Sequence, residues 1–249
     1  MDHRVRSEDA VLRIVEQGDP AGRPLLFLHG GLGLAEEMAP LAACFPEARC
    51  LLLETRGHGG STMGEGRLSY PRLADDAEAV IQALGLQAPL VIGHSDGGVL
   101  ALELAARGRA LSGIVSIGGS VAPPPAEAAE RFFKPMTAAW WRERFPEGIA
   151  RYEAENPAPD FDRLFTAVMR MWLDDGPDNY PRGIERIAVP ALILNGDDDR
   201  LVSRAETVAI ADAIPGAALG LLPYEGHMVH MEQPERVAAC IRAMPSPAG

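Results

Sequence analysis

The sequence contains little cysteine, and this limits the chemistry that it can carry. Its three cysteines, Cys44, Cys50 and Cys240, are scattered along 249 residues. They lack the spacing of a zinc site or of a redox pair. We therefore expect buried, reduced thiols in a reducing compartment.

Basic charge and long apolar runs are also scarce. Lys and Arg number 23 against 35 Asp and Glu, a formal net charge of −12 that argues against a nucleic-acid or anionic-membrane partner. No apolar run approaches the roughly 18 residues of a membrane span, and the charged, alternating residues 1–18 lack the apolar core of a signal peptide. We expect a cytoplasmic protein that acts on a small molecule. Solubility alone explains the acidic charge, although a negative charge would also suit cationic substrates.

The chain shows no internal repeat, and its apolar segments alternate between two kinds. Short runs that are apolar on both faces predict buried strands, and longer segments with apolar residues at helical spacing predict helices. An antiparallel pair of strands is expected at the start, through residues 11–16 and the turn at 18–20. This alternation predicts a parallel sheet covered on both faces by helices. The predicted strands are 24–28, 49–53, 90–92, 114–117, 191–194 and 218–222, and the predicted helices are 72–84, 99–106, 204–213 and 234–243.

The rhythm breaks between residues 120 and 186, where no buried strand is found. This stretch is rich in Pro, Glu, Arg and aromatic residues and predicts a mainly helical lid over the carboxyl edge of the sheet. The core domain would then comprise residues 1–119 and 187–249. Any single ring can belong to the lid's own core, but a lid with so many rings should present some to a pocket. The rings are Phe132, Phe133, Trp140, Trp141, Phe145, Tyr152, Phe161, Phe165 and Trp172.

The strongest chemical signal is the run Gly-His-Ser-Asp-Gly-Gly at 93–98, between a predicted strand and a predicted helix. A serine in G-x-S-x-G at such a junction sits on a sharp bend that exposes its hydroxyl, and the flanking glycines relieve crowding. The helix N-terminus beyond it favours developing negative charge. Ser95 is therefore the predicted nucleophile; the alternative is an ordinary helix cap.

A serine hydroxyl needs a base to take its proton, and six histidines compete for that role. His3 lies in a terminus expected to fray, local hydrogen bonds explain His29 and His58, and His94 should point away from its neighbour Ser95. His227 and His230 remain, in the loop after the last strand, at the edge where Ser95 is expected. Gly226 lets the chain turn there, so His227 is the predicted base and His230 is assigned a structural role.

The base needs a carboxylate to orient it. Asp197, Asp198 and Asp199 follow the strand at 191–194 directly, in the chain order Ser, Asp, His. Acid-rich loops are usually solvated turns, but this loop opens at the same edge of the sheet. The residues alone do not choose among the three aspartates.

The motifs of this sequence resemble those of the α/β-hydrolase family along nearly the whole chain, and the predicted lid is the part that resembles the family least. They are HGG at 29–31, RGHGGS at 56–61, GHSDGG at 93–98, GDDDRLV at 196–202 and GHMVHMEQPE at 226–235. The resemblance implies a mostly parallel eight-stranded sheet with helices on both faces. It also selects Asp199, three residues after a glycine, as the acid, and His227 as the base.

The resemblance further implies an oxyanion hole built from two backbone N–H groups and implies no metal or cofactor. One N–H belongs to Asp96. The other comes from the loop after His29 and Gly30, where we place it at Leu32 because the extra glycine shifts the usual position by one; Gly31 is the alternative. Gly31 and Asp96 are also predicted to contact the substrate. The implied reaction is acyl transfer through Ser95 to an ester, thioester, lactone or amide carbonyl, followed by hydrolysis of the acyl-enzyme.

Asp96 is unusual, because an exposed carboxylate beside an oxyanion disfavours the transition state. The GxSDGG form resembles valacyclovir hydrolase-like enzymes, in which this acid receives the ammonium group of amino-acid esters. We therefore expect a preference for amine-bearing substrates, unless Asp96 turns away to bind local backbone or an arginine of the lid.

Other activities share the same fold and triad. Carbon–carbon bond hydrolases, enol-lactonases and perhydrolases are alternatives within enzymes, and a hydrolase-like binding protein with negligible turnover is the alternative outside them. A haloalkane dehalogenase is disfavoured, because that chemistry needs a carboxylate at position 95. The oligomeric state is left open.

Overall fold

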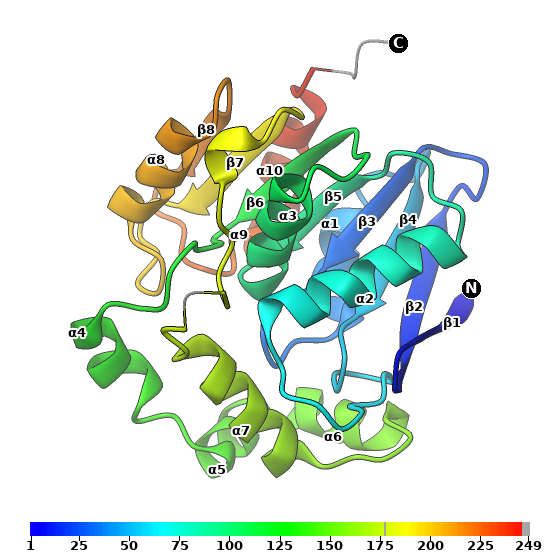
Figure 1. Cartoon of the computed structure of the whole chain (residues 1–249), viewed down its shortest axis with the longest axis vertical. Helices are drawn as coiled ribbons and strands as arrows, with labels where there is room; N and C mark the ends of the chain where they lie inside the picture. Colours follow the sequence, from blue (N-terminus) through cyan, green and yellow to red (C-terminus); the bar gives the residue numbers. More distant parts are fainter. Residues whose placement is uncertain (177, 246–249) are drawn as a thin grey trace.

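The computed structural model describes residues 1–176 and 178–245, which are built around one eight-stranded β-sheet (Figure 1). The strand order is β1-β2-β4-β3-β5-β6-β7-β8; β2 pairs antiparallel with both of its neighbours, and the remaining pairs are parallel. The predicted fold class is therefore confirmed. The strands are β1 (Asp2–Ser7), β2 (Ala10–Gly18), β3 (Pro24–Leu28), β4 (Arg49–Glu54), β5 (Leu90–His94), β6 (Gly113–Ile117), β7 (Ala191–Gly196) and β8 (Ala218–Leu222).

Helices cover both faces of the sheet, because the central strands are apolar on both. In β3, Leu26 and Leu28 face one apolar core and Leu25 and Phe27 face the other. The first core is closed by α2 (Tyr70–Ala83), α3 (Asp96–Ala106) and α8 (Arg204–Ala213). The second is closed by α1 (Ala35–Ala42), α9 (Val229–Glu232) and α10 (Pro234–Arg242). None of the helices in the described part of the chain has both the length and the hydropathy of a membrane span.

The predicted starting hairpin was placed wrongly. The reversal lies at Glu8 and Asp9, where Glu8 adopts a φ of 48°, and residues 18–20 instead lead from β2 towards β3. His3, expected to fray, lies in β1 and pairs with Glu16 at 2.5 Å. The charged, alternating sequence of β1 belongs to an edge strand, whose polar side chains remain near solvent. α1 and α9 were not predicted.

The segment from residue 120 to residue 186, apart from Pro177, forms helices and no strand in its described part. It lies below the sheet in Figure 1. Phe161, Phe165 and Tyr152 are buried, whereas Trp140 and Phe145 are substantially exposed. The helices are α4 (Ala126–Ala128), the π-helix η1 (Ala129–Phe133), α5 (Ala138–Arg144), α6 (Pro146–Glu155), α7 (Phe161–Trp172) and the 3-10 helix η2 (Ile184–Arg186).

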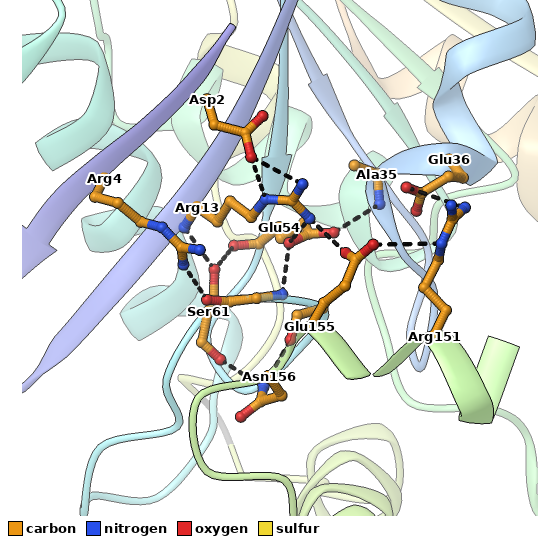
Figure 2. Close-up of polar contacts among 12 residues, drawn as sticks. Asp2, Arg4, Arg13, Ala35, Glu36, Glu54, Ser61, Arg151, Glu155 and Asn156 are labelled. Carbon is orange, nitrogen blue, oxygen red and sulfur yellow. Dashed lines mark hydrogen bonds and ion pairs between the residues drawn. The ribbon is translucent and has the colours of Figure 1, made fainter. Parts of the chain in front are cut away.

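A polar network fastens the end of α6 to the sheet (Figure 2). Arg13 of β2 contacts Glu155 at 2.5 Å and the buried Glu54 at 3.4 Å. Asn156 donates its side-chain N–H groups to the carbonyls of Gly59 (2.7 Å) and Ser61 (2.9 Å). This part of the 120–186 segment is therefore fixed by charge and hydrogen bonds as well as by apolar packing.

The side chain of Arg56 is fully buried, and its charge is compensated mainly by Asp76 of α2. Its Nε and Nη2 atoms donate to the two oxygens of Asp76 at 2.9 and 2.8 Å, and Asp9 provides a further contact. This bidentate pair joins the loop after β4 to α2 and to the N-terminal hairpin.

Replacing Asp76 with alanine should lower the free energy of unfolding by about 3 kcal/mol, because the buried Arg56 charge loses its main partner. Urea denaturation measures the change. The neighbouring Asp75→Ala is the control: its carboxylate is exposed and pairs with Arg107 at the surface, so it should cost less than about 0.5 kcal/mol. Equal effects from the two substitutions would contradict the role assigned to the buried pair.

Candidate active site

Ser95 lies at the bend between β5 and α3 with a backbone φ of 51° and ψ of −113°, a conformation that non-glycine residues rarely adopt. The close approach of β5 and α3 requires glycine at two positions. A Cβ at Gly93 would lie 1.9 Å from the carbonyl oxygen of Gly97, and one at Gly97 would lie 2.1 Å from the carbonyl oxygen of Leu28. The glycines thus allow a strained backbone that holds Ser95 at the carboxyl end of β5.

His227 and Asp199 form a hydrogen-bonded pair beside this bend. The Nδ1 atom of His227 lies 2.7 Å from Oδ2 of Asp199, whose side chain is fully buried. Burial would raise the pKa of Asp199, but His227 and the N–H groups of Leu201 and Val202 hold it below its usual value. Asp199 is therefore charged and fixes a proton on His227 Nδ1, which leaves Nε2 free to act as a base.

The other two aspartates of the acidic loop are exposed. Asp197 accepts a hydrogen bond from Arg204 at 2.9 Å. The N–H of Asp198 donates to the carbonyl of Glu225 at 2.9 Å, which joins the acidic loop to the loop that carries His227.

Ser95 and His227 approach each other across the end of β6. The N–H of Ser95 donates to the carbonyl of Ile117 at 2.8 Å, and a Cβ on the next residue, Gly118, would lie 3.1 Å from Cε1 of His227. Both side chains line the same cavity. No direct hydrogen bond joins them within residues 1–176 and 178–245.

The other histidines have local roles. His29 and His58 are buried and bond to the backbone nearby, as expected. The ring of His94 points away from the bend at Ser95 and towards Glu37, with Nδ1 lying 2.5 Å from Oε1 of Glu37. His230 is fully buried and stacks on His94, with ring centroids 3.9 Å apart.

The loop after β3 holds the two N–H groups considered as the second oxyanion donor, those of Leu32 and Gly31. The Leu32 N–H donates to Nε2 of His58 at 3.1 Å, so it is not available to a ligand in this geometry. Burial lowers the pKa of His58 to about 3, which keeps the ring neutral and able to accept this bond. The Gly31 N–H has no protein acceptor among the described residues and becomes the better candidate. Leu32 itself takes a left-handed φ of 59°.

Asp96 faces the cavity wall rather than local backbone or an arginine. Its carboxylate accepts hydrogen bonds from the Tyr70 hydroxyl at 2.8 Å and from the Trp172 indole N–H at 2.8 and 3.0 Å. Burial raises its pKa to about 6, although these two donors act in the opposite direction. A Cβ at Gly31 would lie 2.5 Å from Oδ2, so glycine is needed there. The sequence did not point to Tyr70, and Trp172 stood out only as one of many rings.

The cavity above Ser95 has a volume of about 1080 Å³. His227, Asp96 and Gly31 share its inner wall with Ser95, and side chains from the 120–186 segment form much of the rest. Most of the predicted lid rings line it; Phe165 is not among them. The lining rings of this segment are Phe132, Phe133, Trp140, Trp141, Phe145, Tyr152, Phe161 and Trp172.

One group of potential metal ligands lies behind the bend: Glu37, His94 and His230. Its geometry fits hydrogen bonding better than ligation. Glu37 Oε1 and His94 Nδ1 are only 2.5 Å apart, closer than two ligands at about 2.0–2.2 Å around a tetrahedral zinc would be.

Comparison with known proteins agrees with this architecture. The family model described as "Alpha/beta hydrolase family" matches residues 25–240. The chain is 28% identical over 254 residues to 2-succinyl-6-hydroxy-2,4-cyclohexadiene-1-carboxylate synthase of Serratia proteamaculans, covering 92% of this chain and 96% of the relative. It is 28% identical over 249 residues to 2-hydroxymuconate semialdehyde hydrolase of Pseudomonas putida, with 91% and 87% covered. Among solved structures, the enol-lactonase from Burkholderia xenovorans LB400 superposes with a TM-score of 0.75 at 20% identity, covering 96% and 98%, which indicates a shared fold.

The raised pKa of Asp96 predicts a stability difference that depends on pH. The pKa of Asp96 is about 6 in the folded protein and 3.8 ordinarily. Between these pH values the folded protein binds a proton at Asp96 that the unfolded chain has lost. The free energy of unfolding therefore falls as pH rises from about 4 to about 6. Asp96→Asn removes this loss. Its free energy of unfolding relative to wild type should therefore increase by about 2–3 kcal/mol between pH 3.5 and pH 7.5.

Urea titrations at several pH values test this expectation, with the exposed Asp75→Asn as a control that should show no such trend. A difference between Asp96→Asn and wild type that stays constant with pH would show that burial does not raise the pKa of Asp96.

Proposed function

The chain belongs to the alpha/beta hydrolase family, and from this premise we propose that it is a serine hydrolase that cleaves a carboxylic ester of a small molecule. Ser95 would be the nucleophile, His227 the base and Asp199 the orienting acid. The observation that carries the proposal is the 2.7 Å bond between His227 and the buried Asp199, beside a serine on a strained bend.

In the proposed reaction, His227 Nε2 takes the proton of Ser95 as Oγ attacks the ester carbonyl. The imidazolium that forms is stabilised by Asp199 and then protonates the leaving alcohol. A water activated by the same nitrogen hydrolyses the acyl-enzyme. No step needs a metal or an organic cofactor.

The oxyanion would accept hydrogen bonds from the backbone N–H groups of Asp96 and Gly31. Neither N–H has a protein acceptor among the described residues, and Asp96 is the first residue of α3, whose dipole favours negative charge. Leu32 is replaced in this role, because its N–H is bonded to His58.

The substrate would be bulky and largely apolar. The wide cavity lined by aromatic side chains supports this. Because many of these side chains come from the 120–186 segment, this segment would act as the lid of the site. We extend the proposal to substrates with an amine group, because the Asp96 carboxylate receives only neutral donors, Tyr70 and Trp172, among the contacts described. A substrate ammonium would supply the missing positive charge. A cytoplasmic location also belongs to this proposal.

A second candidate is hydrolysis of a carbon–carbon bond with the same three residues. The 28% identity to a relative named for hydrolysis of a semialdehyde, rather than of an ester, favours it. A screen of substrates distinguishes the two candidates. If a serine probe labels the enzyme but the enzyme hydrolyses no ester in a broad screen, the second candidate is supported.

Ser95 should react covalently with a fluorophosphonate probe, and Ser95→Ala should abolish both labelling and the hydrolysis of p-nitrophenyl esters. The expected loss in kcat is at least about 1000-fold, because the nucleophile is removed. Intact-mass spectrometry and an ester assay measure the two effects. Ser112→Ala, a serine remote from the cavity, is the control. A folded wild-type protein that stays unlabelled would reject the serine hydrolase and favour a binding protein.

An α-amino ester should be hydrolysed faster than its des-amino analogue by about tenfold or more in kcat/KM, since the amine would pair with Asp96. Asp96→Asn should erase this preference while retaining activity on the des-amino ester. Steady-state kinetics on both esters with both proteins provide the test. Equal rates for the two esters with wild type, or a preference that survives in Asp96→Asn, would exclude the amine site.

A further inference from the structure

A carboxylate that the proposed mechanism does not use lies where three loops of the site meet. Glu37 of α1 presents Oε1 to the Gly30 N–H at 3.1 Å, to His94 Nδ1 at 2.5 Å and to His230 Nε2 at 3.3 Å. Gly30 precedes the proposed oxyanion donor, His94 precedes Ser95, and His230 follows the loop of His227. One oxygen atom therefore touches all three loops.

His94 extends this connection to the proposed base. Its Nε2 atom lies 3.0 Å from the carbonyl oxygen of His227, and its ring is almost completely buried. The chain of contacts thus runs from Glu37 through His94 to the backbone of His227, and the rings of His94 and His227 also touch, with centroids 4.7 Å apart.

The contacts of His94 use both of its ring nitrogens. A backbone carbonyl can only accept a hydrogen bond, so Nε2 donates to the carbonyl of His227. Nδ1 forms a short hydrogen bond with Oε1 of Glu37. Burial lowers the pKa of His94 to about 3, although Glu37 acts in the opposite direction. Glu37 and His94 therefore form a buried hydrogen-bonded pair.

Few other titratable groups face this pair. Burial would raise the pKa of the Glu37 carboxyl, but His94 and His230 hold it well below its usual value. The titratable groups that face the pair are His230 from α9 and His227 from the loop after β8, and Glu37 also influences His58 and Asp96. The ring nitrogens of His230 have no hydrogen-bond partner of good geometry among the described residues.

We propose that Glu37 and His94 are positioning residues: their buried hydrogen-bonded pair sets the oxyanion loop, the Ser95 bend and the His227 loop in one fixed arrangement. This inference rests on the proposed function for its effect on catalysis. The polar contacts of both side chains go to the loops of the site, so both would act through the residues they hold. Small displacements between a base, a nucleophile and an oxyanion donor slow the chemical step more than they weaken substrate binding.

Glu37→Gln tests the proposal because an amide cannot replace the carboxylate at this point. With its oxygen at the position of Oε1, the uncharged amide weakens the bond to His94; with its nitrogen there, it faces the Gly30 N–H with another donor. We expect kcat per active site to fall about 10- to 100-fold, with KM changed less than about threefold.

Counting the active sites separates positioning from stability. Titration with a fluorophosphonate gives the fraction of molecules that react, and kcat is divided by that fraction. Glu54→Gln is the matched control, since Glu54 is also a largely enclosed glutamate but bonds to Gly60 and Ala35 rather than to Gly30, His94 or His230. It should leave kcat per titrated site within about twofold of wild type.

Proton NMR of the histidine rings tests the hydrogen bond without any substrate. Wild type should show a strongly downfield proton in the short bond between His94 and Glu37, and Glu37→Gln should lose this signal. A wild-type spectrum without this proton, or a Glu37→Gln enzyme with normal kcat per titrated site, would overturn the inference. If wild-type protein is not labelled at Ser95, the proposed function fails instead, and the NMR result still decides whether the pair exists.

Discussion

The bend at Ser95 is the constraint on which the site depends. It turns β5 into α3 within one residue of left-handed backbone, and the turn is possible because Gly93 and Gly97 let strand and helix approach to van der Waals limits. The same geometry places the N-terminus of α3 beneath the cavity and brings the end of β6 against both Ser95 and the ring of His227. Strain at this point is maintained by the packing of a central strand, the most rigid part of the fold.

Much of this architecture was predictable from the sequence, because its signals are local. Strands such as PLLFL are apolar on both faces only if both faces are covered, and the glycine–serine run is informative because a strand precedes it and a helix follows. The N-terminal hairpin was misplaced because a charged edge strand has no such signature. The bond between the Leu32 N–H and His58, which favours Gly31 as the proposed oxyanion donor, could not be foreseen because it depends on a loop 26 residues away.

Glu37 could not have been found from the sequence, since it belongs to no motif and lies in a helix that was not predicted. Its proposed role rests on three contacts, with residues 7, 57 and 193 positions away in the chain. Asp96 is the intermediate case. Its position in the motif drew attention to it, but its partners, a tyrosine of α2 and a tryptophan of α7, are visible only in three dimensions.

The network around Arg13 divides the 120–186 segment into two unequal parts. α6 is tied to the sheet through Glu155 and Asn156, whereas within the described chain no ion pair links residues 126–145 to the sheet. Evolution can therefore alter α4, η1 and α5 with little cost to folding, while α6 must keep its polar contacts. We therefore expect related proteins to differ in substrate mainly through α4, η1 and α5, and to keep the polar contacts of α6.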